Sequence, residues 1–140
     1  GNFLIKRVVD SLGTELRGIR TFATLSPIPG FMPWLRRRLR EKDFNFLTRE
    51  QQETLVSMSS KSVNQTAIEA FEHFLFWTEW HDQEDVQSAL QPILLKLAAH
   101  YLVHEKRSGG TALDSVAHFH LNNGSRIEQL HWNDNNQYRL

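Results

Sequence analysis

The sequence predicts a mixed α/β domain, because three successive stretches of the chain differ in the spacing of their apolar residues. Residues 21–25 are rich in β-branched and aromatic side chains and form a candidate strand. The block from about 32 to 107 has helical spacing, and residues 116–132 return to the alternation of strands. We therefore expect an α/β (α+β) fold in which a large helical insertion separates strands 21–25 and 116–121 of one mixed sheet.

Composition narrows the classes of protein that are possible. The 140 residues suffice for one domain with its own core. There is no cysteine, which excludes disulfides, thiol chemistry and cysteine-ligated metals. Lysine and arginine total 16 and balance the 16 acidic residues, so we expect no nucleic-acid partner. We expect no membrane partner and no signal peptide, and the start at Gly1 without methionine leads us to expect a piece of a longer chain.

Start signals divide the helical part of the chain into separate helices. Thr48 and Gln51 have the spacing of a capping box, and Asn64 can cap the helix after it. Pro92 is expected to bend or split the longest helix. An excess of aromatic residues near the middle of the chain favours a partner interface and a homo-oligomer. The expected helices cover residues 3–16, about 33–40, 48–58, 64–78 and 83–104, and the aromatic residues are Phe74, Phe76, Trp77 and Trp80.

The last third of the chain reads as a hairpin with histidines on one strand. Residues 116–121 alternate, which puts His118 and His120 on one face and the apolar Phe119 and Leu121 on the other. Asn123-Gly124 is a strong turn signal, and residues 126–132 form the returning strand. Two such histidines, with His131 across the hairpin, suit zinc, but a third ligand at a diagnostic spacing is missing, so we expect no metal.

A rigid turn holds a serine ahead of the helical block. Pro27 and Pro29 fix their own φ angles and keep Ser26 out of helical geometry, and the stiff segment ends at Gly30. A hydroxyl on such a scaffold suits a reactive or ligand-binding role, although a proline-stiffened connection with an incidental serine gives the same pattern. A histidine paired with Ser26 would make an acid–base or nucleophile–base site.

A second candidate site lies at the start of the chain. Gly1 and Asn2 precede the expected first helix, and free N–H groups at a helix N-terminus bind anions. Asn2 is equally well explained as an ordinary N-cap.

Four stretches of the sequence together resemble a known family. They are residues 1–9, residues 22–31 with Leu-Ser-Pro-Ile-Pro-Gly-Phe, residues 100–110, and residues 114–124 with Phe-His-Leu-Asn-Asn-Gly, followed by Trp132. The sequence resembles malonyl-CoA decarboxylases in their C-terminal catalytic domain, and the four stretches occur in the order of that family.

The resemblance implies a GNAT-like acyl-CoA fold and the decarboxylation of malonyl-CoA without metal or prosthetic group. In the family the matching serine and histidine form a catalytic pair, so these roles fall on Ser26 and His120. We expect the two side chains within about 2.6–3.2 Å of each other, or joined by one water. The coenzyme A pyrophosphate loop of the family ends at the position of Gly1, which assigns acyl-CoA binding to Gly1, Asn2, Ser26 and His120.

The match also indicates which parts of the family's domain fall outside residues 1–140. The strands before the coenzyme A loop and the family's N-terminal helical domain precede Gly1, so we interpret residues 1–140 as a single catalytic-domain fragment. Tyr138 is a possible remnant of a pocket-forming string, and we assign it no role. The alternative function is a non-catalytic acyl-CoA-binding or oligomerisation module of the same descent. We expect a bacterial cytoplasmic or mitochondrial matrix location, because the C-terminal Tyr-Arg-Leu is not the peroxisomal Ser-Lys-Leu.

Overall fold

A computed structural model describes residues 27–59, 65–77, 79–127 and 129–130 of the chain. The expected first helix (3–16) and the expected strand 21–25 lie outside these ranges. In the described ranges every regular element is helical, where we expected a mixed sheet. The elements are α2 (Phe31–Arg38), α3 (Arg49–Met58), α4 (Ala67–Trp77), the 3-10 helix η1 (Trp80–Asp82), α5 (Glu84–His104) and α6 (Ser115–Asn122).

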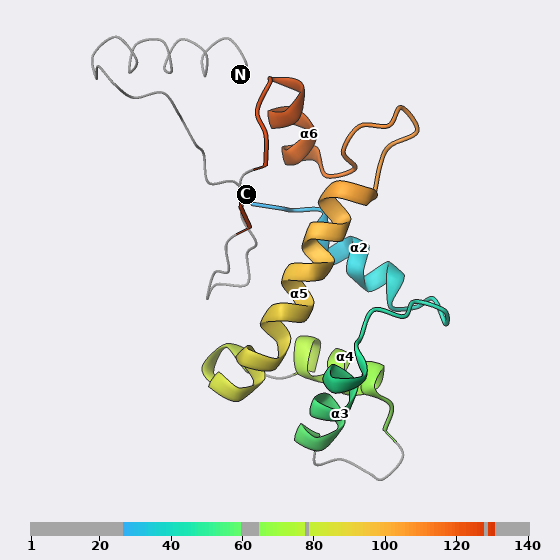
Figure 1. The fold of residues 1–140 in the computed structure, drawn as a ribbon, viewed down its shortest axis with the longest axis vertical. Coiled ribbons are helices and arrows are strands. Elements are labelled where there is room, and N and C mark those ends of the chain that lie inside the picture. The colour runs from blue at the N-terminus through green and yellow to red at the C-terminus, as the bar shows by residue number, and fades with distance from the viewer. Residues whose placement is uncertain (1–26, 60–64, 78, 128, 131–140) are drawn as a thin grey trace, which may run out of the picture.

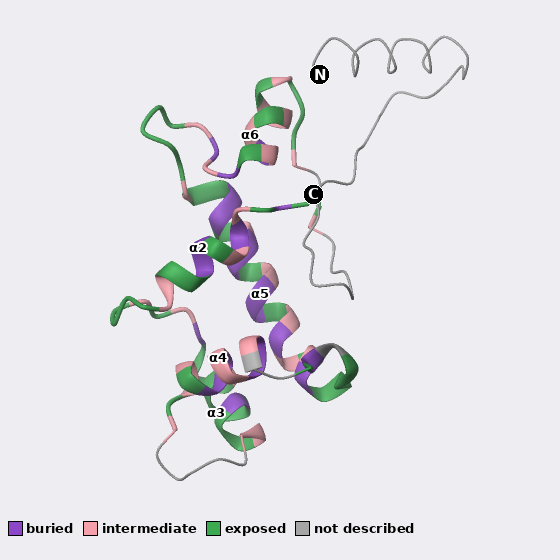
Figure 2. Cartoon of the chain, turned by 180° about the vertical axis from the view of Figure 1, so that it is seen from behind, coloured by how far each residue is buried: buried purple, intermediate pink, exposed green. Residues whose placement is uncertain are grey.

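Helix α5 is the axis of the described structure. It has 21 residues and runs from α3, α4 and η1 at one end to α6 at the other (Figure 1). Buried residues follow it along its length and continue on α2 (Figure 2). Pro92 does not split the helix, contrary to one of the two outcomes we expected. Pro92 and Ser88, whose carbonyl has lost its helical partner, are both exposed, so water can solvate that carbonyl.

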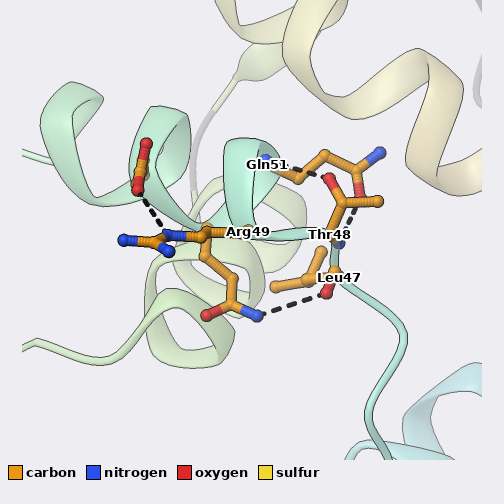
Figure 3. Close-up of polar contacts among 6 residues, drawn as sticks. Leu47, Thr48, Arg49 and Gln51 are labelled. Atoms are coloured by element: carbon orange, nitrogen blue, oxygen red, sulfur yellow. Dashed lines mark hydrogen bonds and ion pairs between the residues drawn. The ribbon is translucent and has the colours of Figure 1, made fainter.

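Helices α3 and α4 begin with capping boxes and pack against each other. The Thr48–Gln51 box is confirmed: Gln51 N–H donates to Thr48 Oγ1 (3.2 Å) and Thr48 N–H donates to Gln51 Oε1 (2.9 Å), as Figure 3 shows. Thr66 and Glu69 make the same reciprocal pair at the start of α4. The cap of α4 is therefore Thr66, two residues after the expected cap, Asn64, which lies outside the described residues.

A chain of aromatic contacts links α5 and α2 to α4 through the loop before α3. Ring centres are 5.2 Å apart for Tyr101 and Trp34, 6.1 Å for Trp34 and Phe44, 4.8 Å for Phe44 and Phe46, and 5.1 Å for Phe46 and Phe71. Such contacts add to the free energy of apolar burial.

Two of the aromatic residues assigned to a partner surface belong to this core instead. Phe74 is 8% exposed and Trp80 is 3% exposed. The ring of Phe76 is half-buried and lies under the Arg36 guanidinium, 4.2 Å from the ring centre. The expectation of an aromatic partner surface was therefore wrong for Phe74 and Trp80, because neighbouring helices already cover them.

Residues 115–122 form helix α6, so the strand predicted over 116–121 was wrong. Asp114 caps the helix: its Oδ1 accepts hydrogen bonds from the N–H groups of Val116 and Ala117, both at 3.0 Å. Ala117 and Leu121 face the core and are four residues apart, so they share a helix face, and Leu113, just before the cap, packs against the same core. A six-residue alternation fits a strand as well, and the cap resolves the ambiguity in favour of the helix.

The Asn123-Gly124 pair ends α6 and does not make the predicted hairpin turn. Gly124 has a φ of 84°. Its N–H donates to the carbonyl of Leu121 (3.2 Å), and the N–H of Ser125 donates to the carbonyl of His120 (3.1 Å). These two bonds make a Schellman motif, in which glycine takes the left-handed position. The described residues after it, 125–127 and 129–130, form no strand.

Candidate functional site

The described part of the serine turn runs from Pro27 to Gly30 and leads directly into α2. Ile28 is 6% exposed and anchors the segment in the core between the two exposed prolines. The carbonyl of Ile28 accepts a hydrogen bond from Phe31 N–H (3.3 Å), and that of Gly30 accepts one from Trp34 N–H (3.1 Å). The segment is therefore fixed by burial as well as by the φ angles of its prolines.

Asp114 connects this segment to the start of α6. Its Oδ2 accepts a hydrogen bond from Gly30 N–H (2.9 Å), while its Oδ1 accepts the two N–H groups of the α6 cap. The residue is 2% exposed and is the buried charged residue of the described core. A buried carboxylate is stable only when its oxygens are well hydrogen-bonded, and three backbone donors satisfy that need here.

Tyr101 of α5 supplies a fourth donor to the same carboxylate through its hydroxyl. Burial, followed by the nearby charge of Asp114, raises the pKa of Tyr101 from 10.0 to about 12. The positive charges of Arg37 and Arg107 lower this pKa, but by less than burial and Asp114 raise it. The hydroxyl is therefore a neutral donor throughout the physiological pH range.

Gly30 is required at this junction because of space and not because of its backbone angles. Its φ of −81° and ψ of −11° suit any residue. A Cβ at this position would overlap the Tyr101 hydroxyl and lie 3.0 Å from Asp114 Oδ2. Only a glycine lets the three groups approach as closely as they do.

His120 lies in the last turn of α6 and is half-buried. Its ring contacts Phe119 edge-on, with centres 5.3 Å apart and planes at 76°. Phe119 is 39% exposed, so the expectation that it is buried opposite His120 was wrong. His118 does not share a face with His120, because residues two apart in a helix point about 200° from each other. Its Nε2 lies 3.0 Å from Nδ2 of Asn122.

The sequence also contains a basic run from Arg36 to Arg40, which is a weaker candidate for binding a coenzyme A phosphate than the start of the first helix. Two of its arginines already have intramolecular contacts. Arg36 lies over Phe76, and the Arg38 guanidinium lies 4.5 Å from the ring centre of Phe44 and is ion-paired with Glu41. Among the described residues, no three histidine, aspartate or glutamate side chains are placed to hold a metal ion. Within the same ranges, no helix is both long and apolar enough to cross a membrane.

Residues 1–139 match the family model described as the malonyl-CoA decarboxylase C-terminal domain. The chain belongs to this family. Mitochondrial malonyl-CoA decarboxylases of goose (Anser anser anser) and mouse (Mus musculus) are 38% and 39% identical to it, over 94% of this chain. The crystal structure of malonyl-CoA decarboxylase from Rhodopseudomonas palustris is 38% identical over 93% of the chain, with a TM-score of 0.70. The chain spans 26–27% of the length of the goose and mouse malonyl-CoA decarboxylases.

The sequence motifs of the malonyl-CoA decarboxylase family thus identified the domain correctly, but most of the predicted site is not described. Gly1, Asn2 and Ser26 lie outside the described residues, so their pairing with His120 stays a prediction. Sequence reasoning missed the role of Asp114, Tyr101 and Gly30. The available signal was an aspartate directly before residues 115–122, which is a typical N-cap and was not considered as one.

Proposed function

We propose that this chain is part of an enzyme that decarboxylates malonyl-CoA to acetyl-CoA and carbon dioxide, with Ser26 and His120 as the catalytic pair. Family membership supports the substrate. The residue roles come from the matching Leu-Ser-Pro-Ile-Pro-Gly and Phe-His-Leu strings of the sequence.

The reaction needs little more than stabilisation of charge and delivery of one proton. The bond between the carboxylate carbon and the methylene carbon breaks, carbon dioxide leaves, and the electron pair remains as a thioester enolate. Hydrogen-bond donors stabilise the enolate oxygen, and a proton added to its carbon gives acetyl-CoA. Histidine exchanges protons near neutral pH and can do so through a neighbouring hydroxyl. Either Ser26 or His120 can deliver the proton in this scheme.

The observation that carries the proposal is the hydrogen bond between Gly30 and Asp114. These residues are 84 positions apart in the sequence, yet Gly30 N–H lies 2.9 Å from Asp114 Oδ2. Ser26 precedes Gly30 by four residues, which bounds the distance between their Cα atoms to about 14 Å. His120 follows Asp114 by six helical residues, a rise of about 9 Å. Chain geometry therefore allows the two side chains to meet.

The test measures acetyl-CoA formation by the protein expressed at the length of its natural reading frame. His120→Ala and Ser26→Ala should each remove most of the activity with little loss of coenzyme A affinity. The double variant should be hardly worse than either single one, because the pair acts as a unit. His118→Ala, on the same helix, is the matched control and should keep the activity. Full activity in His120→Ala would refute the catalytic pairing.

Coenzyme A binding through Gly1 and Asn2 belongs to the same proposal. Its phosphates would accept hydrogen bonds from the first N–H groups of the helix expected over residues 3–16. A homo-oligomer, and a location in the bacterial cytoplasm or mitochondrial matrix, remain expectations. The solved relative is bacterial and the goose and mouse relatives are named mitochondrial. The alternative of a non-catalytic module is less well supported, because Phe74 and Trp80, which favoured it as exposed aromatic residues, are buried.

A further inference from the structure

One buried carboxylate joins the two parts of the chain that the proposed function needs together. The two carboxylate oxygens of Asp114 have different partners. Oδ1 accepts hydrogen bonds from the N–H groups of Val116 and Ala117 at the start of α6, and Oδ2 accepts one from Gly30 N–H at 2.9 Å. An N-cap needs only one side-chain acceptor, as Thr48 shows at the start of α3. The second oxygen of Asp114 is therefore available for a purpose other than capping.

The surroundings hold this carboxylate in one position. Asp114 and Tyr101 are each 2% exposed, and the Tyr101 hydroxyl donates to the carboxylate from α5. Tyr101 is itself packed against the rings of Phe31 and Trp34 of α2, at centre distances of 6.1 and 5.2 Å. Three elements, α2, α5 and α6, thus meet at one group whose hydrogen bonds are directional and charge-assisted.

We propose that Asp114 is a positioning residue for the decarboxylation, which fixes the serine turn and the histidine helix relative to each other. The proposal rests on the proposed function and extends it to a residue that touches neither the substrate nor the reacting atoms. Asp114 holds Gly30, at the end of the turn that begins with Ser26, and it holds the first turn of the helix that ends with His120. A shift at Asp114 therefore changes the distance between the two catalytic side chains.

The consequence for catalysis is a loss of turnover without a loss of substrate binding. Misplacement of a catalytic group by about 1 Å can cost on the order of 100-fold in rate. Of the four residues expected to contact acyl-CoA, Gly1 and Asn2 are the ones expected to bind the coenzyme A phosphates, and Asp114 holds neither of them. The kcat should therefore fall while KM changes little, whereas general destabilisation would lower the amount of active enzyme and leave the kcat of the folded fraction unchanged.

The decisive variant is Asp114→Ser. Serine is as good an N-cap as aspartate, so α6 keeps its cap, but it has no second oxygen for Gly30 and Tyr101. Asp114→Asn is the second variant. It preserves the shape of the side chain, so it covers the case in which Asp114→Ser fails to fold, and its amide NH2 cannot accept hydrogen bonds from one of the two sets of donors. Thr48→Ala is the matched control, because it removes a cap far from this junction. Each variant is made in the protein at the length of its natural reading frame, and kinetics are measured alongside hydrogen–deuterium exchange.

We expect Asp114→Ser and Asp114→Asn to lower kcat by about 10- to 100-fold at nearly constant KM. We also expect faster exchange in residues 27–30 and 115–122 together, and Thr48→Ala should change exchange in α3 alone and leave kcat intact. An active protein whose Asp114 variants keep full kcat would overturn the proposal. If the unsubstituted protein does not decarboxylate malonyl-CoA, the proposed function fails, and exchange decides the coupling separately: faster exchange in both segments supports it, and faster exchange confined to α6 refutes it.

Discussion

Replacing Gly30 with alanine tests the close approach of Gly30, Tyr101 and Asp114 most directly. The added Cβ would overlap the Tyr101 hydroxyl and lie 3.0 Å from Asp114 Oδ2 and 3.3 Å from Tyr101 Cζ. Ordinary carbon–oxygen contacts are about 3.3–3.6 Å long, so the hydroxyl has to move by on the order of 1 Å. Tyr101 is 2% exposed and has no room to move without disturbing its neighbours.

The magnitude follows from three separate terms. Overpacking of a core typically costs about 1–3 kcal/mol. Loss of the hydrogen bond from Tyr101 to the charged Asp114 costs about 1.5–3 kcal/mol. Alanine also stabilises the protein by about 0.4–1 kcal/mol, because it lowers the conformational entropy of the unfolded chain and the backbone angles at position 30 are compatible with alanine. Gly30→Ala should therefore lower the free energy of unfolding by about 2–5 kcal/mol, measured by urea unfolding.

The control for this experiment is Gly109→Ala, since a Cβ at Gly109 would meet nothing within 4 Å. Adding Tyr101→Phe to Gly30→Ala should recover part of the loss, because the overlapping oxygen is gone while the contact to Cζ remains tight. A coupling of at least about 1 kcal/mol is expected for groups in direct contact. If Gly30→Ala were no less stable than Gly109→Ala, the close approach would be refuted.

Two further outcomes are expected. Tyr101→Phe should be less stable than the unsubstituted protein below pH 10. The difference in free energy of unfolding should narrow as the pH rises from 10 towards 12, because a group whose pKa is raised by folding contributes stability that is lost as it deprotonates. Urea midpoints at pH 9 and pH 12 measure this difference, and a difference that widens would contradict the prediction. Pro92→Ala should stabilise the protein by up to about 3 kcal/mol, because it restores a helical N–H in the middle of α5 at an exposed position. Unchanged stability in thermal unfolding would show that α5 has relaxed fully around the proline.

The features that the sequence predicted well depend on neighbours within one helical turn. The Thr48–Gln51 capping box and the end of α3 at Met58 were predicted correctly, because the cap, the first turn and the apolar spacing all belong to one short stretch. The family was identified from four stretches of the sequence, two of which contain the specific strings Leu-Ser-Pro-Ile-Pro-Gly-Phe and Phe-His-Leu-Asn-Asn-Gly. These signals are local, so no tertiary contact could override them.

The predictions that failed involve contacts between distant parts of the chain. Residues 116–121 alternate over too few positions to distinguish a strand from a helix, and the deciding group is the buried carboxylate of Asp114. The position of Asp114 depends in turn on Gly30, 84 residues earlier. Phe74 and Trp80 were taken as surface because their own helix could not cover them, and their burial comes from the packing of other helices.

The aromatic chain from Tyr101 to Phe71 has an optical consequence. Because Tyr101 and Trp34 have ring centres 5.2 Å apart, light absorbed by the phenol passes to the indole and is emitted there. Trp34 is 3% exposed, so its emission belongs to an apolar environment. The rings also couple asymmetrically, which produces a near-ultraviolet circular dichroism signal that is lost when fixed packing is lost. The Tyr101–Trp34 pair at the junction of α2 and α5 therefore contributes to these signals together with the other three tryptophans of the chain, and loosening beside Asp114 should change that contribution.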